Sequence, residues 1–414
     1  MQYRAALLSV LLFTSLVGAA AAPAAGQQAS GEAYSGAHVQ FDGGSNAVTD
    51  YAVDGNVIVE NVTMQSSSEV RGQAGVGIDA GLSATTNING ASIDSQTKVS
   101  ASVSLGFESG GNMTAYDTTR GVVQFNAAEG DQVVNAKLSS NAQAESEGDK
   151  RVVVTKEDGS QGAFIVVGDG EVVVNEQGNV TAEVKEGSQL VYRQYNDERS
   201  QKEEEAERMI QNGTATAEVY VQQAQDDGED AADEGNETAV ETIEYGQDTT
   251  VEVTSRSKNN VEMAVERSQS QGKVVLTTVS KEAFENAENI QVFVDGSAAV
   301  QVDSYSAVEQ SAMQGDQPRY YVSQSSSAEA AVDIAVGIDH FSTRNVQMTS
   351  TQDATPTPTP TATDSMDEST ATTTDSTDES TATATDSTSG DGAGFGVLAA
   401  LSALASALFV RRRR

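Results

Sequence analysis

The sequence predicts a mainly β protein, with an antiparallel sandwich or solenoid-like body and a few short helices. Runs rich in Val, Ile, Phe and Tyr recur about every ten residues through much of the chain. Asp-Gly and Gly-Asn pairs stand between these runs, and such pairs are typical of the tight turns that join antiparallel strands. Residues 72–105 are rich in Gly, Ser and Ala, and these small side chains favour stacked strands or a solenoid.

The strand pattern is clearest over residues 151–193. Five runs alternate there with turn residues: Arg151–Thr155, Gly162–Val167, Glu171–Asn175, Val180–Val184 and Gln189–Arg193. Further strands are expected at Thr216–Gln222, Thr238–Glu244, Thr249–Thr254, Val261–Arg267, Lys273–Val279, Ile290–Asp295, Ala298–Asp303, Arg319–Ser323, Ala331–Ile338 and Asn345–Met348.

Three short helices are expected within this pattern. Residues 196–212 offer few apolar side chains, so this helix is expected to lie on the surface as an insertion. Ser280 is a candidate N-cap for a second helix over residues 280–284. A third helix is expected over residues 304–313, followed by a glycine that stops it.

The composition divides the chain into six segments. Residues 1–26 carry one arginine, an apolar run and then small residues, as in a Sec-type signal peptide. Residues 350–392 are rich in Thr, Ser, Asp and Pro and predict a disordered, solvated stalk. The expected segments are 1–26 signal peptide, 27–148 Gly/Ser/Ala-rich β region, 149–255 β domain with a helical insertion, 256–349 β-rich α+β domain, 350–392 stalk and 393–414 sorting signal or membrane anchor.

The chain is strongly acidic. It has 24 basic and 61 acidic side chains, which give a formal net charge of −37. Such a charge repels itself, and molar salt shortens the screening length to about 3 Å and removes most of that cost. The charge therefore indicates a halophilic, archaeal surface protein, and it argues against binding to nucleic acid. The absence of cysteine from the sequence excludes disulfides and thiolate chemistry.

The C-terminal residues predict a membrane attachment. Ala393, Gly394 and Phe395 precede an apolar run to Val410, which as a helix would span roughly 24 Å, somewhat less than the ~30 Å hydrocarbon core. The run is closed by a basic cluster of Arg411, Arg412, Arg413 and Arg414. The positive-inside rule places these arginines in the cytoplasm and the body outside. On these features alone the segment is a short transmembrane anchor.

This tail also resembles the PGF-CTERM sorting signal of haloarchaeal surface proteins. Gly394 and Phe395 match that motif, the arginines match its end, and Ala393 stands where the family has proline. In that family an archaeosortase removes the helix and the arginines, and a prenyl-type lipid replaces them. The resemblance therefore implies archaeosortase processing and lipid anchoring, and it covers only the tail and the style of the stalk.

Catalytic motifs are scarce in the body. The sequence has two histidines, His38 and His340, and no Gly-x-Ser-x-Gly motif accompanies them. Asp339 precedes His340, but neighbouring strand residues face opposite sides, so the two are not expected to form a catalytic pair. No catalytic residue and no cofactor site is predicted.

Two kinds of surface site have a sequence signal. The acidic segment with Asp226, Asp227, Glu229 and Asp230 is a weak calcium candidate, and a solvated loop is the more favoured interpretation because the spacing of a calcium loop is absent. Five Asn-x-Thr sites fit the N-glycosylation pattern. They are Asn61, Asn112, Asn179, Asn212 and Asn236, and Asn212 and Asn236 are favoured because they flank expected surface insertions.

These observations predict a non-enzymatic, glycosylated protein, exported and held at the cell surface by its C-terminal end. The expected role is structural or adhesive, beside S-layer or other envelope proteins. The alternative is a displayed module that binds a solute, an ion or a glycan in a polar cleft lined by Arg193, Arg256 or Arg319. An extracellular hydrolase is a third possibility, and it requires His340 to lie beside a serine.

Overall fold

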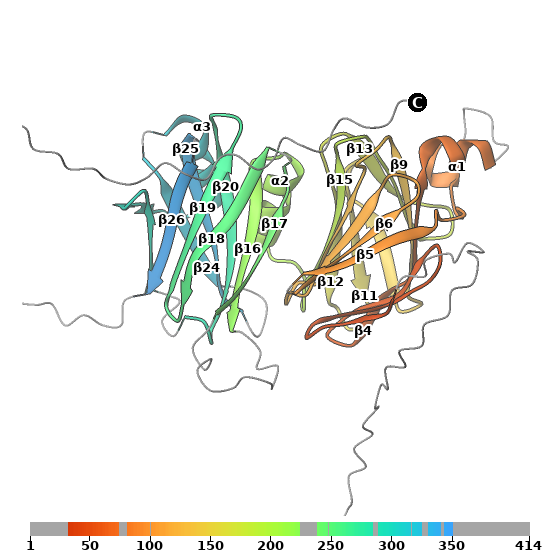
Figure 1. Ribbon diagram of the computed structural model, residues 1–414, viewed down its shortest axis with the longest axis horizontal. Coiled ribbons are helices and arrows are strands. Elements are labelled where there is room, and N and C mark those ends of the chain that lie inside the picture. The colour runs from red at the N-terminus through yellow and green to blue at the C-terminus, as the bar shows by residue number, and fades with distance from the viewer. Residues whose placement is uncertain are drawn as a thin grey trace, which may run out of the picture. The chain divides into compact units, whose positions relative to one another are not determined.

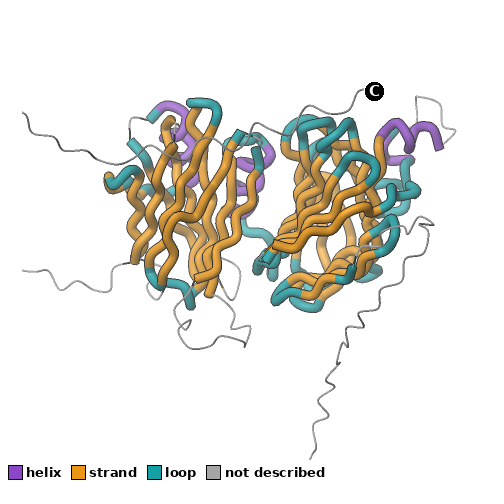
Figure 2. Tube along the Cα trace, viewed as in Figure 1, coloured by secondary structure: helices purple, strands orange, loops and turns teal. Residues whose placement is uncertain are grey.

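The computed structural model describes residues 32–73, 81–99, 101–223, 238–246, 248–284, 289–315, 317–324, 330–340 and 343–350. These residues belong to one compact unit, and strands dominate it (Figures 1 and 2). Four sheets form two sandwiches, each with its own core, so the mainly β, antiparallel class is confirmed. The signal peptide, the acidic segment 226–230, the stalk and the C-terminal tail lie outside the described residues.

The first sandwich is built from sheets A and B. Sheet A has the order β1 (Tyr34–Ser35), β2 (Val39–Gly43), β3 (Val48–Val53), β4 (Asn56–Ser66), β9 (Gln132–Leu138), β14 (Val180–Val184) and β13 (Gly170–Val174). Sheet B has the order β10 (Ala142–Ser146), β11 (Arg151–Lys156), β12 (Gln161–Val167), β15 (Gln189–Gln194), β8 (Val122–Asn126), β7 (Asn112–Tyr116), β6 (Ser102–Phe107) and β5 (Ile93–Val99). Successive strands cross between the sheets, because β12 and β15 lie in sheet B and β13 and β14 lie in sheet A.

Alternating side chains fill the space between these sheets. The ring of Tyr51 in sheet A packs edge to face against that of Tyr192 in sheet B, with 6.5 Å between the ring centroids. The centroids of Tyr192 and Phe164 lie 4.7 Å apart. Small residues such as Ala115 and Ala182 are also fully buried in this core. A filled core between two sheets defines a sandwich, so this part of the body is not a solenoid.

The second sandwich is built from sheets C and D. Sheet C has the order β17 (Thr238–Glu244), β16 (Ala215–Gln223), β20 (Gln271–Ser280), β25 (Ala330–His340), β24 (Arg319–Gln324) and β23 (Val300–Gln301). Sheet D has the order β18 (Thr249–Ser257), β19 (Asn260–Arg267), β26 (Thr343–Ser350), β21 (Ile290–Val294) and β22 (Ser297–Ala298). The pairs β16–β20 and β23–β24 are parallel, and the other pairs in both sandwiches are antiparallel. The last described strand, β26, lies inside sheet D between β19 and β21.

In the part of the chain that the structure describes, three α-helices accompany the strands. The helix α2 (Gln201–Gln211) starts later than the expected residue 196, after the N-cap Ser200, which forms a capping box with Glu203. The helix α3 (Tyr305–Gln314) begins at Ser304 and stops at Gly315, as expected. The helix α1 (Ser67–Gln73) and the short 3₁₀ turn η1 (Leu82–Ala84) were not expected. Ser280 caps a turn rather than a helix over residues 281–284, and residues 285–288 are not described.

The expectation that α2 is a surface insertion is wrong. Ala206, Met209 and Ile210 are buried, and so is the carboxylate of Glu207. The helix lies between sheet B and sheet C, against β12 and β16 (Figure 1). It belongs to a third apolar cluster, which we call the joint, made by the outer face of sheet B (Val122, Ala163, Ile165, Val167, Val191), α2, the outer face of sheet C (Ala215, Tyr220, Ile243, Tyr245, Val274, Leu276, Ala335) and α3 (Tyr305, Val308, Ala312).

The joint explains why some strands are apolar on both faces. Every residue of β15 is buried, and so is every residue of β12 after Gln161. A strand covered on both sides loses the alternation of apolar and polar residues. Continuous structure also crosses both expected internal domain boundaries, since β10 pairs with β11 across residue 148, and β18 runs through residue 255.

Candidate functional site

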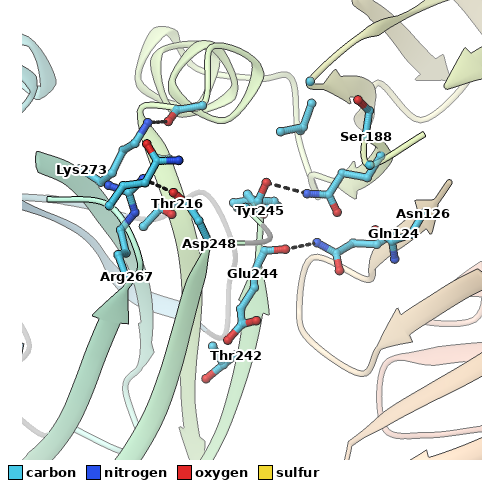
Figure 3. A pocket seen from close by; sticks show the side chains of 18 of the residues that line it. Gln124, Asn126, Ser188, Thr216, Thr242, Glu244, Tyr245, Asp248, Arg267 and Lys273 are labelled. Atoms are coloured by element: carbon cyan, nitrogen blue, oxygen red, sulfur yellow. Dashed lines mark hydrogen bonds and ion pairs between the residues drawn. The ribbon is translucent and has the colours of Figure 1, made fainter. Parts of the chain in front are cut away.

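A polar cleft lies where strands of sheet B meet the second sandwich. Its volume is about 630 Å³. The first sandwich contributes the side of β8 and β15, and the second contributes the ends of β16, β17, β19 and β20 (Figure 3). The principal side chains in the lining are polar: Tyr116, Gln124, Asn126, Ser188 and Gln189 from the first sandwich, and Thr216, Thr242, Glu244, Tyr245, Asp248, Arg267, Gln269, Gln271 and Lys273 from the second.

Two glutamines of the first sandwich hold the back of the cleft together. Gln124 Nε2 donates to the carbonyl oxygen of Glu244 at 2.8 Å, and Gln189 Nε2 donates to that of Tyr245 at 2.8 Å (Figure 3). Tyr116 Oη donates to Gln124 Oε1 at 2.9 Å and orients the first of these amides. The end of β17 is therefore fixed by side chains of sheet B, and the cleft is formed in advance of any ligand.

Arg267 belongs to the wall of the cleft. Its Nε donates to Thr249 Oγ1 at 3.1 Å, and its other nitrogens bond Asp248 and the carbonyl oxygen of Gln271. The side chain is only 2% exposed. A guanidinium engaged on three sides positions the neighbouring loop, so we assign Arg267 a structural role.

Lys273 and Glu244 are the cleft's two charged side chains that form no ion pair with another described residue. Lys273 Nζ donates to the carbonyl oxygen of Gly213, and burial, together with the positive charge of Arg267, lowers the pKa of its amine. Glu244 Oε1 accepts from Val251 N at 2.9 Å, and burial raises the pKa of this carboxyl. Each side chain therefore retains hydrogen-bonding capacity toward a ligand, since an ammonium has three donors and a carboxylate about four acceptor positions.

The joint beneath the cleft contains a buried ion pair. Arg193 of β15 and Glu218 of β16 approach to 2.8 Å, and each side chain is 2% exposed. Tyr220 Oη and Tyr245 Oη also donate to Glu218, at 2.8 and 2.5 Å. Burial opposes the charge on Arg193, yet Glu218 raises the pKa of this guanidinium. Tyr245 connects the two features, since it also lines the cleft.

A second group of buried charges links the first sandwich to α2 and to sheet C. Arg120, in the loop before β8, lies 2.7 Å from Asp333 of β25 and 3.5 Å from Glu203 of α2. Thr278 Oγ1 donates to Asp333 at 2.8 Å. The guanidinium of Arg120 lies 5.2 Å from the ring centroid of Tyr195, a cation–π distance. The first sandwich, α2 and sheet C thus meet at one arginine.

The helix α2 is held by a third group. Arg199 Nη1 lies 2.6 Å from Glu207 Oε2, and Arg199 Nη2 lies 2.8 Å from Glu147 Oε1. Arg151 also contacts both of these carboxylates, Glu147 at 2.8 Å and Glu207 at 3.4 Å. Burial raises the pKa of Glu207, and Arg199 opposes that rise.

The histidines take part in local pairs. His340 Nδ1 lies 2.8 Å from Asp339 Oδ2 at the end of β25, so the expectation that these neighbours face apart is wrong there. The His340 side chain is 65% exposed, and its bonds to other described residues involve no serine hydroxyl. His38 Nδ1 lies 2.9 Å from Asp54 Oδ1 on the surface.

The three arginines considered for a binding cleft are separate from it. Arg193 is buried in the joint, Arg256 is exposed on β18 and Arg319 begins β24. None of them lines the polar cleft. The calcium candidate, Asp226, Asp227, Glu229 and Asp230, lies outside the described residues. Within the described ranges, no group of three or more acidic or histidine side chains has the arrangement of a metal site.

The five sequons differ in their surroundings. Asn112 Oδ1 accepts from Asn126 Nδ2 at 2.9 Å, and Asn179 Oδ1 accepts from the backbone N of Leu138 at 3.0 Å. Asn61 on β4 is partly exposed, Asn212 after α2 is exposed, and Asn236 is outside the described residues.

The sorting motif with Gly394, Phe395 and the four arginines is also outside the described residues. Among the helices that the structure describes, none has the length and apolar character to span a bilayer.

Glu218, Glu244 and Lys273 were not among the site residues predicted from the sequence. Glu218 carried a signal, because it interrupts the apolar strand Ala217–Val221 at a position that faces a second apolar layer rather than solvent. Glu244 and Lys273 had no such signal, since each stands at a strand end where polar residues are ordinary.

The comparisons with known proteins give little further information. No family model matches the chain, and no curated protein does either. Among solved structures, a mutant of a family 81 glycoside hydrolase from Clostridium thermocellum is similar over 77% of this chain, with 9% sequence identity and a TM-score of 0.34. The chain spans about a third of that protein's length, 35%.

Proposed function

We propose that this protein is a non-enzymatic, membrane-anchored surface glycoprotein of a halophilic archaeon, with a structural or adhesive role in the cell envelope. The signal peptide, the stalk and the basic tail support export and anchoring. The acidic composition supports a halophilic setting. Turnover of a substrate by the purified protein would contradict the proposal.

The joint is the observation that supports a structural role. The two sandwiches share an apolar cluster, and three groups of buried charges tie that cluster to α2 and to both neighbouring sheets. A buried ion pair favours one arrangement of its surroundings, because any displacement leaves charges unpaired in a medium of low polarity. The body is therefore built to keep its two halves in a fixed relation, as a spacer or an adhesive unit requires.

The anchoring is tested on the native protein extracted from cell envelopes. Peptide mass spectrometry reads the mature C-terminus, and membrane fractionation follows the protein. Loss of everything from about Ala393 onward, with the protein still in the membrane, is the expected result. An intact Arg414 would indicate a transmembrane anchor without processing, and recovery in the soluble fraction would contradict anchoring altogether.

The cleft favours a second function, the binding of a small polar ligand such as a saccharide. Its four charged side chains comprise two acids and two bases, so the cleft is formally neutral on a strongly acidic protein. Amides, hydroxyls and backbone carbonyls in a preformed cavity of this size suit a hydroxylated ligand. Lys273 and Glu244 supply the charged contacts.

A complementation experiment separates the two functions. A strain without the gene receives either the joint variant Glu218→Ala or the cleft variant Lys273→Gln, and envelope integrity and cell adhesion are measured. A structural role predicts that only the joint variant fails. A binding role predicts that the cleft variant fails although it is folded, and that saccharides raise the melting temperature of the original protein but not of Lys273→Gln. The exposed Lys98→Gln serves as the matched control.

A further inference from the structure

We infer that Asn61 carries an N-linked glycan, and that the first sugars of this glycan lie in a polar depression on the outer face of sheet A. The inference rests on the export that the proposed function includes. It goes beyond that function by separating Asn61 from the sequons Asn112 and Asn179 and by assigning the sugars a binding surface on the protein itself.

The structure separates the sequons by what their amides already do. The side-chain oxygens of Asn112 and Asn179 accept hydrogen bonds within the fold, from Asn126 and from the backbone of Leu138. The Asn61 side chain has no hydrogen bond to another described residue and is partly exposed. An acceptor asparagine must present its amide nitrogen to an enzyme, and Asn61 does so without losing a contact of the native fold.

A bulge in β4 turns this position outward. The pairing of β4 with β9 shifts register between Val59 and Asn61, so Glu60 and Asn61 are both partly exposed in succession. Such an extra residue breaks the alternation of a strand and re-aims the next side chains. Val62 and Met64 return to the core beyond it.

The depression lies directly beside the Asn61 side chain. It is open, has a volume of about 710 Å³, and is lined by Asn61 itself and by Thr49, Asn56, Glu60, Lys137 and Asn141 among others. Lys137 Nζ and Glu60 Oε2 pair at 2.6 Å, and the Lys137 side chain is 59% exposed. Hydroxyl, amide and charged groups around an open surface are the partners that sugar hydroxyls need, and the volume is that of a site for a drug-sized ligand.

The modification itself needs a lipid-linked oligosaccharide phosphate as the donor. Asn61 Nδ2 forms a bond to the anomeric carbon of the first sugar while the bond from that carbon to the phosphate oxygen breaks. The amide loses one proton to a base of the transferring enzyme, and the lipid phosphate leaves with the electron pair. Thr63 completes the acceptor sequence, and no oxidation or reduction occurs.

Glycopeptide mass spectrometry of the full-length protein from its producing cells tests the acceptor. We expect Asn61 to be occupied and Asn112 and Asn179 to be bare. The variant Thr63→Ala should lose the Asn61 glycan, and Thr63→Ser should keep it. An unmodified Asn61 in the original protein would overturn the inference.

Labelling of lysine amines tests where the glycan lies. In the original protein Lys137 should react several-fold more slowly with an acylating reagent than in Thr63→Ala, while the exposed Lys98 should react equally in both. The same pair of proteins made in a host without N-glycosylation should show no difference at Lys137. Equal Lys137 reactivity despite an occupied Asn61 would show that the glycan extends into solvent, and that result would overturn the binding surface.

Discussion

Arg193 shows how one side chain can control the joint. Its only ion-pair partner among the described residues is Glu218, and both side chains are almost completely buried. Removal of one partner of such a pair is far more costly than the pair's own contribution, because the remaining charge stays buried without compensation. Tyr220 and Tyr245 would lose their acceptor at the same time.

We therefore expect Glu218→Ala to lower the free energy of unfolding by roughly 3–5 kcal/mol. The control is Glu205→Ala, which removes an exposed pair with Arg208 at 3.8 Å and should change stability by less than about 1 kcal/mol. Denaturant unfolding of both variants at the same salt concentration provides the measurement. Equal losses in the two variants would show that the joint pair is no more important than a surface pair.

Glu244 leads to a prediction about pH. Burial raises the pKa of this carboxyl above its ordinary value of 4.5, so the folded protein binds the proton more tightly than the unfolded chain. The stability that this group contributes is complete below pH 4.5 and is lost as the pH rises through the folded pKa.

Glu244→Gln should consequently raise the free energy of unfolding at pH 7, and this gain should disappear below pH 4.5, where the original side chain is also neutral. Glutamine keeps an acceptor for the backbone N of Val251. Unfolding curves between pH 4 and pH 8 in molar salt test this, with the exposed Glu171→Gln as the control. A gain that does not change with pH would mean that proton binding is not its cause.

Single residues also mark the limit of what the sequence predicts. The alternative of a ligand-binding module named Arg193 among three arginines for the lining of a polar cleft. In the structure Arg193 faces the second sandwich, where it pairs with Glu218 of β16. No local pattern relates these two positions, since the contact depends on how two separate sandwiches pack.

At the scale of elements, α3 depends on two glycines in the sheet beneath it. A side chain at Gly272 of β20 would meet the carbonyl oxygens of Ala312, Ile338 and Asp339, the nearest at 1.9 Å. One at Gly337 of β25 would meet the carbonyl oxygen of Val308 at 2.5 Å. Because these two glycines on adjacent strands have only a hydrogen atom as their side chain, the backbone of α3 can lie close to the sheet.

Gly272→Ala should lower the free energy of unfolding by at least ~1–3 kcal/mol, because backbone atoms must move to admit the methyl group. Gly72→Ala provides the contrast, since nothing lies within 4 Å of the added methyl and the residue is inside α1. That substitution should be neutral or should stabilise the protein by up to about 1 kcal/mol. A tolerated Gly272→Ala, with an unchanged melting temperature, would contradict the close packing of α3.

The elements themselves were largely predictable, and their partners were not. The runs at 180–184 and 238–244 match β14 and β17 to the residue, since alternation and turn residues are local signals. The place of α2 was mispredicted because its few apolar side chains suggested a surface helix, whereas Glu203 and Glu207 are buried against Arg120 and Arg199. Buried charges look like surface charges until their partners are known.

At the scale of the whole molecule, the dominant property is the net charge of −37. Repulsion between surface carboxylates opposes compaction, and salt screens it over about 10 Å at 0.1 M and about 3 Å at 1 M. The melting temperature should therefore rise as sodium chloride increases between these concentrations, and choline chloride of equal ionic strength should act similarly. A flat or falling melting temperature would mean that surface repulsion does not limit stability.

The position of β26 has a consequence for biosynthesis. This strand is the last described part of the body, yet it lies between β19 and β21 and supplies both with hydrogen bonds. A chain that emerges from its N-terminal end cannot complete sheet D until Ser350 is free, so β19 and β21 have exposed edges up to that moment. Residues beyond Ser350 must therefore already be synthesised before β26 can take its place between β19 and β21.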